Sequence, residues 1–317
     1  MPFKEPSVTV LVTVKNSAKT IKKCIDSILK LNYKNKKVYV TDAYSTDGTW
    51  EILKKYGKKI RLGRVKGNIA VGHNYMIKKC KTDFVALTDA DCVVDKNWLK
   101  HLINAFKSEE IIATGGMVES TRSSNKLQQL LGRELKYRFL SLPRHVRRLP
   151  TISLCIRTNY AKKIHFDKDL DVAQETDWGY RITKIGKMLF VPKAVVYHYH
   201  RTTWKDYFKQ QFKYGRFTPI LYFKKGHLKR AFGDEISKSY MALQILLIYF
   251  GVIGLLLGFL NNTFFVMPTI LFTVLLITYI FHAIKLSKTL IDFFMFLGIF
   301  VVRNIAWCLG IIRGIFI

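Results

Sequence analysis

Two carboxylates, Asp89 and Asp91, stand two residues apart in the stretch FVALTDADCVV, at the end of an apolar run. Burying a carboxylate is costly unless it is paired with a positive charge or bound to a cation. The pair is therefore a candidate cation site where a buried strand ends. A solvated turn that happens to contain two acids is the simpler alternative.

Other polar residues also follow strand-like runs. Residues 7–14 read SVTVLVTV, which is typical of a buried parallel strand, and a stretch with helical spacing follows. This alternation recurs through residue 106 and predicts a doubly wound α/β sheet, where ligands bind at the carboxyl ends of the strands. The segment 45–49 would also serve as an ordinary turn and helix cap. We expect one crevice to collect the polar residues Asn16, Asp42, Ser45, Asp47, Asp89 and Asp91.

The composition restricts the partners of the chain. Its 317 residues carry a formal net charge of +30, which favours a polyanionic partner, an anionic membrane surface or a phosphate-bearing substrate. No nucleic-acid recognition motif occurs, so we expect no nucleic-acid partner. The five cysteines are scattered without a CxxC pair, which predicts free thiols in a reducing compartment. The first residues lack a signal-peptide pattern and are expected to form a strand.

From Met241 onward the chain is almost continuously apolar. Three stretches of about 20 residues are candidate membrane spans, at 241–260, 263–283 and 290–312. The third contains Asp292 and Arg303, so it either spans, lies in the interface or bends. Lysines and arginines cluster before the first span, and Lys285 and Lys288 lie between the second and the third. By the positive-inside rule both of these segments are cytoplasmic, and so is the N-terminal part. We therefore predict a soluble domain over 1–235 and a multi-pass cell-membrane domain over 236–317.

Seven motifs in order resemble a family 2 glycosyltransferase of the GT-A fold, over roughly residues 6–230. They are VTVKN (12–16), TDAYSTDGT (41–49), AVGHN (70–74), LTDADCVV (87–94), GG (115–116), QETDWGYR (174–181) and VVYHYHR (195–201). The resemblance implies a Rossmann-like, mostly parallel α/β catalytic domain followed by the transmembrane helices. A single motif of this kind would be weak evidence, because two acids at this spacing occur in many proteins.

The resemblance also implies roles for the donor-side residues. Asp42 matches the acid that contacts the nucleobase, Asn16 lies in the loop that faces the nucleotide, and His73 stands where a phosphate or ribose contact is common. Asp89 and Asp91 match the DxD pair that binds a divalent cation, Mg²⁺ or Mn²⁺, on the pyrophosphate leaving group. In this reading Asp89 also contacts the nucleotide-sugar.

The remaining motifs concern the base, the metal and the acceptor. Glu175 matches the general base that removes the proton of an attacking sugar hydroxyl, although Glu175 and Asp177 would also cap a helix. His198 is favoured over His200 as a further metal ligand. The segment QQFKYGR resembles an acceptor-site motif with Gln210, Lys213 and Tyr214 at matching positions; a basic helix next to the membrane explains it equally well.

A basic segment over 125–148 has leucines at helical spacing, which is typical of an amphipathic helix at an anionic interface. We expect Arg144, Arg147 and Arg148 to contact the phosphates of a lipid-linked acceptor. A solvated cationic helix is the alternative.

These features together predict an inverting, metal-dependent transferase. It would move a sugar from a nucleoside-diphosphate sugar, with a UDP-sugar favoured, to a polyprenyl-linked saccharide at the cytosolic face of the membrane. A polyprenyl-phosphate sugar synthase is the first alternative; its ionised acceptor would need no base. A membrane-tethered protein that binds without catalysing is the second.

Overall fold

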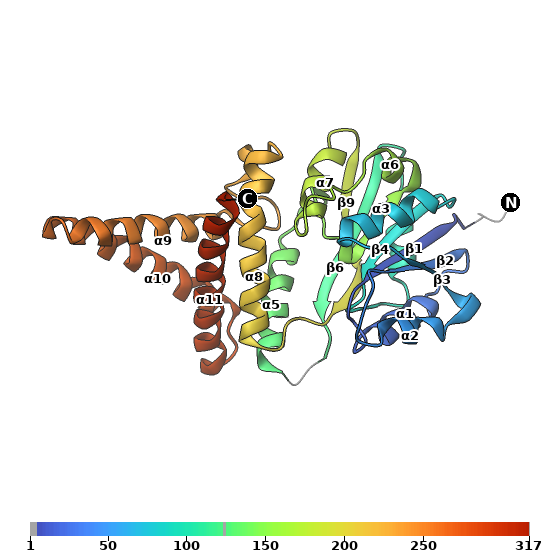
Figure 1. Ribbon diagram of the computed structural model, residues 1–317, viewed down its shortest axis with the longest axis horizontal. Helices are drawn as coiled ribbons and strands as arrows, with labels where there is room; N and C mark the ends of the chain where they lie inside the picture. The colour runs from blue at the N-terminus through green and yellow to red at the C-terminus, as the bar shows by residue number, and fades with distance from the viewer. Residues whose placement is uncertain (1–4, 123–124, 317) are drawn as a thin grey trace. The chain divides into compact units, whose positions relative to one another are not determined.

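The computed structural model of the chain describes residues 5–122 and 125–316 (Figure 1). The chain divides into two compact units. The sheet unit contains Met1–Thr121 and Phe139–Tyr199, and the helical unit contains Arg122–Arg138 and His200–Ile317. The predicted boundary near residue 235 differs from this division, because helix α8 (Trp204–Pro219) packs along helix α11 (Leu290–Ile315) in the helical unit.

The described part of the sheet unit contains a single mixed sheet. Its strands are β1 Val8–Val14, β2 Lys36–Asp42, β3 Arg61–Arg64, β4 Phe84–Asp89, β5 Cys92–Val94, β6 Ile111–Ser120, β7 His145–Val146, β8 Leu154–Arg157 and β9 Lys187–His198. The strand order is β3-β2-β1-β4-β8-β6-β9-β5, and β7 pairs with β9. The first four strands are parallel, as the repeated strand–helix alternation predicts. Strands β5, β7 and β8 pair antiparallel with their neighbours, so the later part of the sheet is mixed rather than mostly parallel.

Six helices lie between these strands in the described part of the sheet unit. They are α1 Ile21–Leu29, α2 Thr49–Lys54, α3 Ile69–Lys79, α4 Trp98–Asn104, α6 Thr158–Lys163 and α7 Gln174–Ile182, with short 3₁₀ turns at Gly57–Lys59 and Thr151–Ser153. Helix α1 shows why the sequence folds this way. Its apolar residues recur at helical spacing, and Ile21, Cys24, Ile25 and Ile28 are all buried. Strand β1 offers the matching surface, because five of its seven residues are apolar and six are buried.

The helical unit contains α5 (Lys126–Leu140, whose last two residues belong to the sheet unit), α8, α9 (Ser239–Gly258), α10 (Val266–Leu286) and α11. Helix α8 continues as a π-helical turn at Ile220–Lys224, and 3₁₀ turns lie at Leu228–Arg230 and Asn262–Phe265. One core joins the helices; it includes Leu127, Leu130, Leu131, Tyr207, Leu275, Tyr279, Phe296, Ile299 and Phe300. The predicted basic segment 125–148 forms a helix that ends at Leu140, and Leu127, Leu130 and Leu131 of this helix pack into the core.

Three of these helices are long and apolar enough to cross a membrane, at Ser239–Gly258, Asn262–Leu286 and Leu290–Ile315. Their mean hydropathies are 2.3, 2.3 and 2.0. They coincide with the three predicted apolar segments to within a few residues at each end. The predicted fold class, a Rossmann-like α/β domain with apolar C-terminal helices, is therefore confirmed.

Candidate active site

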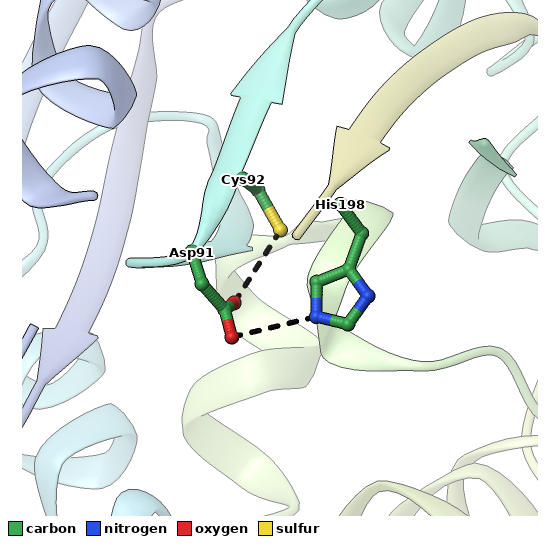
Figure 2. Close-up of side chains that lie close together, drawn as sticks. All are labelled: Asp91, Cys92 and His198. Carbon is green, nitrogen blue, oxygen red and sulfur yellow. Dashed lines mark hydrogen bonds and ion pairs between the residues drawn. The ribbon is translucent and has the colours of Figure 1, made fainter. Parts of the chain in front are cut away.

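The residues after β4 are joined to the end of β9. In the antiparallel pairing of β5 with β9, Cys92 lies opposite His198, so their side chains lie on the same face. The amide of Tyr199 donates to the carbonyl of Asp91 at 2.9 Å and fixes the turn between β4 and β5. As a result Asp91 Oδ2 lies 3.4 Å from His198 Nε2, and the Cys92 thiol lies 3.7 Å from Asp91 Oδ1 (Figure 2).

This arrangement brings two predicted metal ligands together. The ligand atoms of Asp91, Cys92 and His198 all lie within 4.8 Å of one another. A carboxylate oxygen and an imidazole nitrogen are donors that Mn²⁺ and other divalent cations accept. Sequence reasoning did not include Cys92 in the group, because only the β5–β9 register reveals that the thiol faces His198.

Asp89 is the second acid of the group. Burial and the nearby charge of Asp91 raise the pKa of Asp89 to about 7, and the charge of Glu175 adds to this effect. His198 acts in the opposite direction. The negative charges of Asp91 and Glu175 repel the Asp89 carboxylate, and a bound cation would relieve this repulsion. The donor set therefore fits a divalent cation.

Glu175 lies in the first turn of α7, after Ala173 with its positive φ of 64°. Burial raises the pKa of Glu175, and the charge of Arg148 partly offsets the shift. Glu175 and Asp177 both lie in the first turn of α7, and the Glu175 carboxylate accepts from its own backbone amide, so the capping role stays a prediction beside the base role. Asp177 also accepts from Arg181 at 2.6 Å.

Arg148 lies close to α7. It is only 7% exposed, and a Cβ on Gly179 would come within 2.6 Å of the Arg148 Cβ. Arg148 is therefore largely shielded from solvent, and its predicted contact with the acceptor phosphates stays a prediction. Arg144 and Arg147 are exposed on the neighbouring loop, and Arg144 lines a separate cavity of about 730 Å³ in the sheet unit.

The nucleotide-side residues meet at the ends of β1 and β2. The register pairs Val14 with Asp42 and Thr13 with Asp89, which places both acids at the same edge of the sheet. Asn16 joins the loop after β1 to the loop after β2. Its side-chain oxygen accepts from Thr46 N at 2.9 Å, and its backbone N–H donates to Ser45 Oγ at 2.8 Å. Asn16 adopts a positive φ of 52°, a conformation that asparagine tolerates better than most residues.

Sequence reasoning missed the residues that surround Asp42. Asp42 is fully buried and accepts from Arg64 Nε at 3.0 Å. The Arg64 guanidinium lies 4.7 Å from the ring centroid of Tyr44 and 4.4 Å from that of Trp50. Tyr44 is 53% exposed, so a flat apolar surface lies open beside the buried acid. The sequence offered one indication of this contact, because Arg64 is the last residue of β3.

His73 lies in α3 and is fully buried, with its ring 5.2 Å from that of Phe166. Burial lowers the pKa of His73 to about 3, so the imidazole is neutral near pH 7. Neither ring nitrogen has a hydrogen-bond partner among the described residues. This burial argues against the predicted nucleotide contact, which requires an accessible ring.

The three residues of the predicted acceptor motif lie on α8 in the helical unit. Lys213 and Tyr214 are exposed, and Gln210 is half-buried. The neighbouring Gln211 accepts from Trp307 Nε1 at 2.9 Å, so this part of α8 is also hydrogen-bonded to α11.

Residues 9–164 match the family model described as Glycosyl transferase family 2. The chain therefore carries a family 2 glycosyltransferase domain. Glycosyltransferase AglE of Haloferax volcanii is 23% identical over 224 residues, which cover 67% of this chain and 72% of that protein. Poly-beta-1,6-N-acetyl-D-glucosamine synthase of Staphylococcus aureus is 26% identical over 158 residues, which cover 48% of this chain and 37% of the synthase. The predicted family and enzyme class are confirmed.

The fold has a counterpart among solved structures. Mannosyltransferase PcManGT from Pyrobaculum calidifontis, in complex with GDP-Man and Mn²⁺, superposes with a TM-score of 0.58 at 15% identity. The superposition covers 96% of this chain and 88% of that one. At this identity the likeness concerns the fold alone.

Proposed function

We propose that this glycosyltransferase moves a sugar from a nucleoside-diphosphate sugar to a membrane-bound, polyprenyl-linked saccharide with inversion at the anomeric carbon. The proximity of Asp91 Oδ2 and His198 Nε2, at 3.4 Å and beside a second acid, carries the proposal. It supports a cation site at the sheet edge where the donor of a doubly wound fold binds. An inverting displacement then requires one base and no enzymic nucleophile.

The divalent cation, Mg²⁺ or Mn²⁺, would be held by Asp91 and His198, with Asp89 as a further ligand. Such a cation neutralises charge on the pyrophosphate leaving group. Asp89 gains from a bound cation, because burial and the nearby charge of Asp91 destabilise its ionised carboxylate.

Glu175 is the proposed general base. Its raised pKa brings it closer to the operating pH than an ordinary glutamate, which favours proton transfer from a sugar hydroxyl. The positive charge of the buried Arg148 acts against this shift. Turnover that survives replacement of Glu175 by glutamine would instead favour a phosphate acceptor, because the attacking oxygen of an ionised phosphate needs no base.

The donor nucleotide is proposed to bind beside Asn16, Asp42 and the exposed face of Tyr44. A nucleobase can stack on an aromatic ring, and the buried Asp42 can accept from a base N–H. We favour a UDP-sugar. GDP-sugars are the second group of donors to be tested, because the Pyrobaculum protein was solved with GDP-Man.

The acceptor is proposed to be a lipid at the cytosolic face of the cell membrane, where the chain is multi-pass. Three long apolar helices and the net charge of +30 support this location. The helical unit also contains an apolar cavity of about 240 Å³, lined by Tyr222, Phe232, Lys238, Ile245, Trp307 and others. Lys238 at this cavity is suited to a lipid phosphate.

The test uses the full chain in membranes with a panel of UDP- and GDP-sugars and a membrane lipid extract. Mass spectrometry of the lipid fraction should detect one added sugar residue with one group of donors, and chelation by EDTA should abolish the product. No transfer from any donor, or transfer that is indifferent to EDTA and to Asp91→Asn, would contradict the proposal.

A further inference from the structure

Helix α11 has the length and hydropathy of a membrane span, but its neighbours differ from those of α9 and α10. Helices α9 and α10 pack against each other and project together as a hairpin (Figure 1). Helix α11 runs crosswise to this hairpin and lies along α8 instead (Figure 1). If the hairpin crosses a bilayer along its own axis, α11 lies in the plane of that bilayer.

The contact between α11 and α8 is close and extends along most of α8. Trp204 near the start of α8 lies beside Gly298, and a methyl group on Gly310 or Gly314 would collide with the α8 backbone near Phe212 or Arg216. The two helices therefore run in parallel over several turns. Wherever α11 lies in the membrane, α8 lies at the same depth.

Helix α8 is too polar for the hydrocarbon core. Lys205, Lys209 and Lys213 recur every four residues and are all exposed, so they form one cationic face. A spanning α11 would carry these ammonium groups across a hydrocarbon layer of about 30 Å, where charged side chains are strongly disfavoured. The same lysines are well placed at the headgroup level, next to anionic lipids.

The other neighbour of α11 is also charged. Arg303 in the middle of α11 donates to Glu134 of α5 at 2.6 Å, and Asp292 accepts from Arg133 of α5 at 2.5 Å. Helix α5 is a basic helix that includes Lys126, Arg133, Lys136 and Arg138. Two polar helices thus flank α11, one on the α8 side and one on the α5 side.

Most of the exposed surface of α11 is apolar. Its exposed apolar residues are Leu290, Ile291, Phe294, Val301, Ile305, Leu309, Ile312 and Ile315, and Arg313 near the end of the helix is exposed beside them. The buried surface of the same helix carries Asp292, Arg303 and Asn304 among apolar residues. A helix of this kind contacts lipid on one side and protein on the other, so its orientation is set by α5 and α8, which pack against it. The described residues of α9 and α10 contain Lys285 but no row of exposed lysines like that of α8.

We infer that α9 and α10 form the only two membrane crossings of the described helical unit, and that α11 lies flat in the interface with its exposed apolar residues in the lipid. Helices α5 and α8 lie beside it at the headgroup level, where the exposed lysines of α8 meet anionic lipid. Residues that follow α11 are then on the same side of the membrane as residues that precede α9. This inference rests on the proposed membrane location but not on the proposed reaction.

Single cysteines in the full chain test the inference in sealed membrane vesicles. The five native cysteines are buried, so a membrane-impermeant maleimide should react mainly with the introduced thiols. The positions are Lys229→Cys before α9, Thr263→Cys at the exposed tip of the hairpin, and a cysteine added after Ile317. The added cysteine and Lys229→Cys should react from one side, and Thr263→Cys from the other. Reaction of the added cysteine from the same side as Thr263→Cys would show three crossings and overturn the inference.

A depth measurement checks the same point without a topology reporter. Ile305 and Leu276 are both exposed, at 47% and 52%, and each lies near the middle of its helix. A fluorophore on Ile305→Cys should be quenched by lipids brominated near the headgroup, whereas one on Leu276→Cys should be quenched by lipids brominated at the bilayer centre. Equal quenching of both positions by the central lipids would also overturn the inference.

The outcomes separate this inference from the proposed function. Protein that alkaline carbonate extracts from the membrane, or Lys229→Cys and Thr263→Cys that react from one side, would refute both the location and the hairpin. Failure of sugar transfer with two crossings intact would refute only the proposed reaction.

Discussion

The buried charges of the two units fall into two arrangements. In the helical unit the buried Asp292, Glu134 and Arg303 have close partners of opposite sign, as in the 2.6 Å contact between Arg303 and Glu134. In the sheet unit Asp42 is paired with Arg64 in the same way, whereas the charges of Asp91 and Glu175 raise the pKa of Asp89 and the charge of His198 lowers it. Paired buried charges fix a structure, whereas crowded like charges leave a strong demand for a cation. The comparison suggests which charges serve assembly and which serve chemistry.

The largest effect should come from the proposed base. Glu175→Gln should lower turnover by roughly 10²- to 10⁴-fold at pH 7, with little change in donor binding. A base acts in its deprotonated form, and burial raises the pKa of Glu175, so wild-type activity should fall with decreasing pH below a midpoint higher than that of an ordinary glutamate. The substitution should remove this acidic limb from the pH–rate profile.

The exposed Glu109→Gln, in the same unit, is the control and should keep the wild-type profile. A Glu175→Gln enzyme with near-wild-type turnover would exclude the base role and favour the polyprenyl-phosphate acceptor.

Breaking a paired charge in the helical unit should have the next largest effect, on the stability of the protein rather than on its activity. Glu134→Leu leaves Arg303 buried with only neutral partners, and the free energy of unfolding should fall by about 3–5 kcal/mol. The double variant Glu134→Leu with Arg303→Leu should recover much of the loss. Thermal unfolding in detergent measures both. A single variant as stable as the wild type would show that this pair does not hold the unit together.

Removing one acid from the cation site should lower activity but not stability. Asp91→Asn removes a cation ligand and should reduce transfer by roughly 10²- to 10³-fold, the usual cost of losing one stabiliser of transition-state charge. The thermal midpoint should change little or rise, because one like charge is gone. Calorimetric titration with Mn²⁺ should show weakened binding.

Asp95→Asn is the matched control for Asp91→Asn, because Asp95 lies four residues on and its carboxylate accepts only from the backbone amide of the nearby Asn97 among the hydrogen bonds described. Loss of stability in Asp91→Asn without loss of Mn²⁺ binding would break the distinction between the two units.

The smallest effect concerns His73. Its folded-state pKa of about 3 lies below the ordinary value near 6.5, so the buried neutral ring favours folding above pH ~6.5 and this contribution is lost as the pH falls. The slope should be at most about 1.4 kcal/mol per pH unit between these values. His73→Phe should flatten the dependence of the thermal midpoint on pH in this range. An unchanged slope would show that other groups control acid stability.

Local patterns predicted much of the sheet unit. β-branched runs and helical spacing specify β1 to β4 and the helices between them, because these elements bury one face against their immediate neighbours. The position of Asp42 and Asp89 at strand ends was also readable. The same patterns could not show that Arg64 pairs with Asp42, that Cys92 faces His198, or that Arg148 is buried near Glu175. Each of these contacts joins segments whose register is set by the whole sheet.

The helical unit gives the clearest division between sequence and tertiary structure. Composition by itself determined that α9, α10 and α11 are long apolar helices, since helix length and hydropathy depend only on nearby residues. It determined equally that Asp292 and Arg303 require partners. Only the tertiary structure decided that those partners are Arg133 and Glu134 of α5, and that α11 lies along the charged α8. Hydropathy measures how well a helix tolerates lipid, whereas its orientation depends on the helices packed against it.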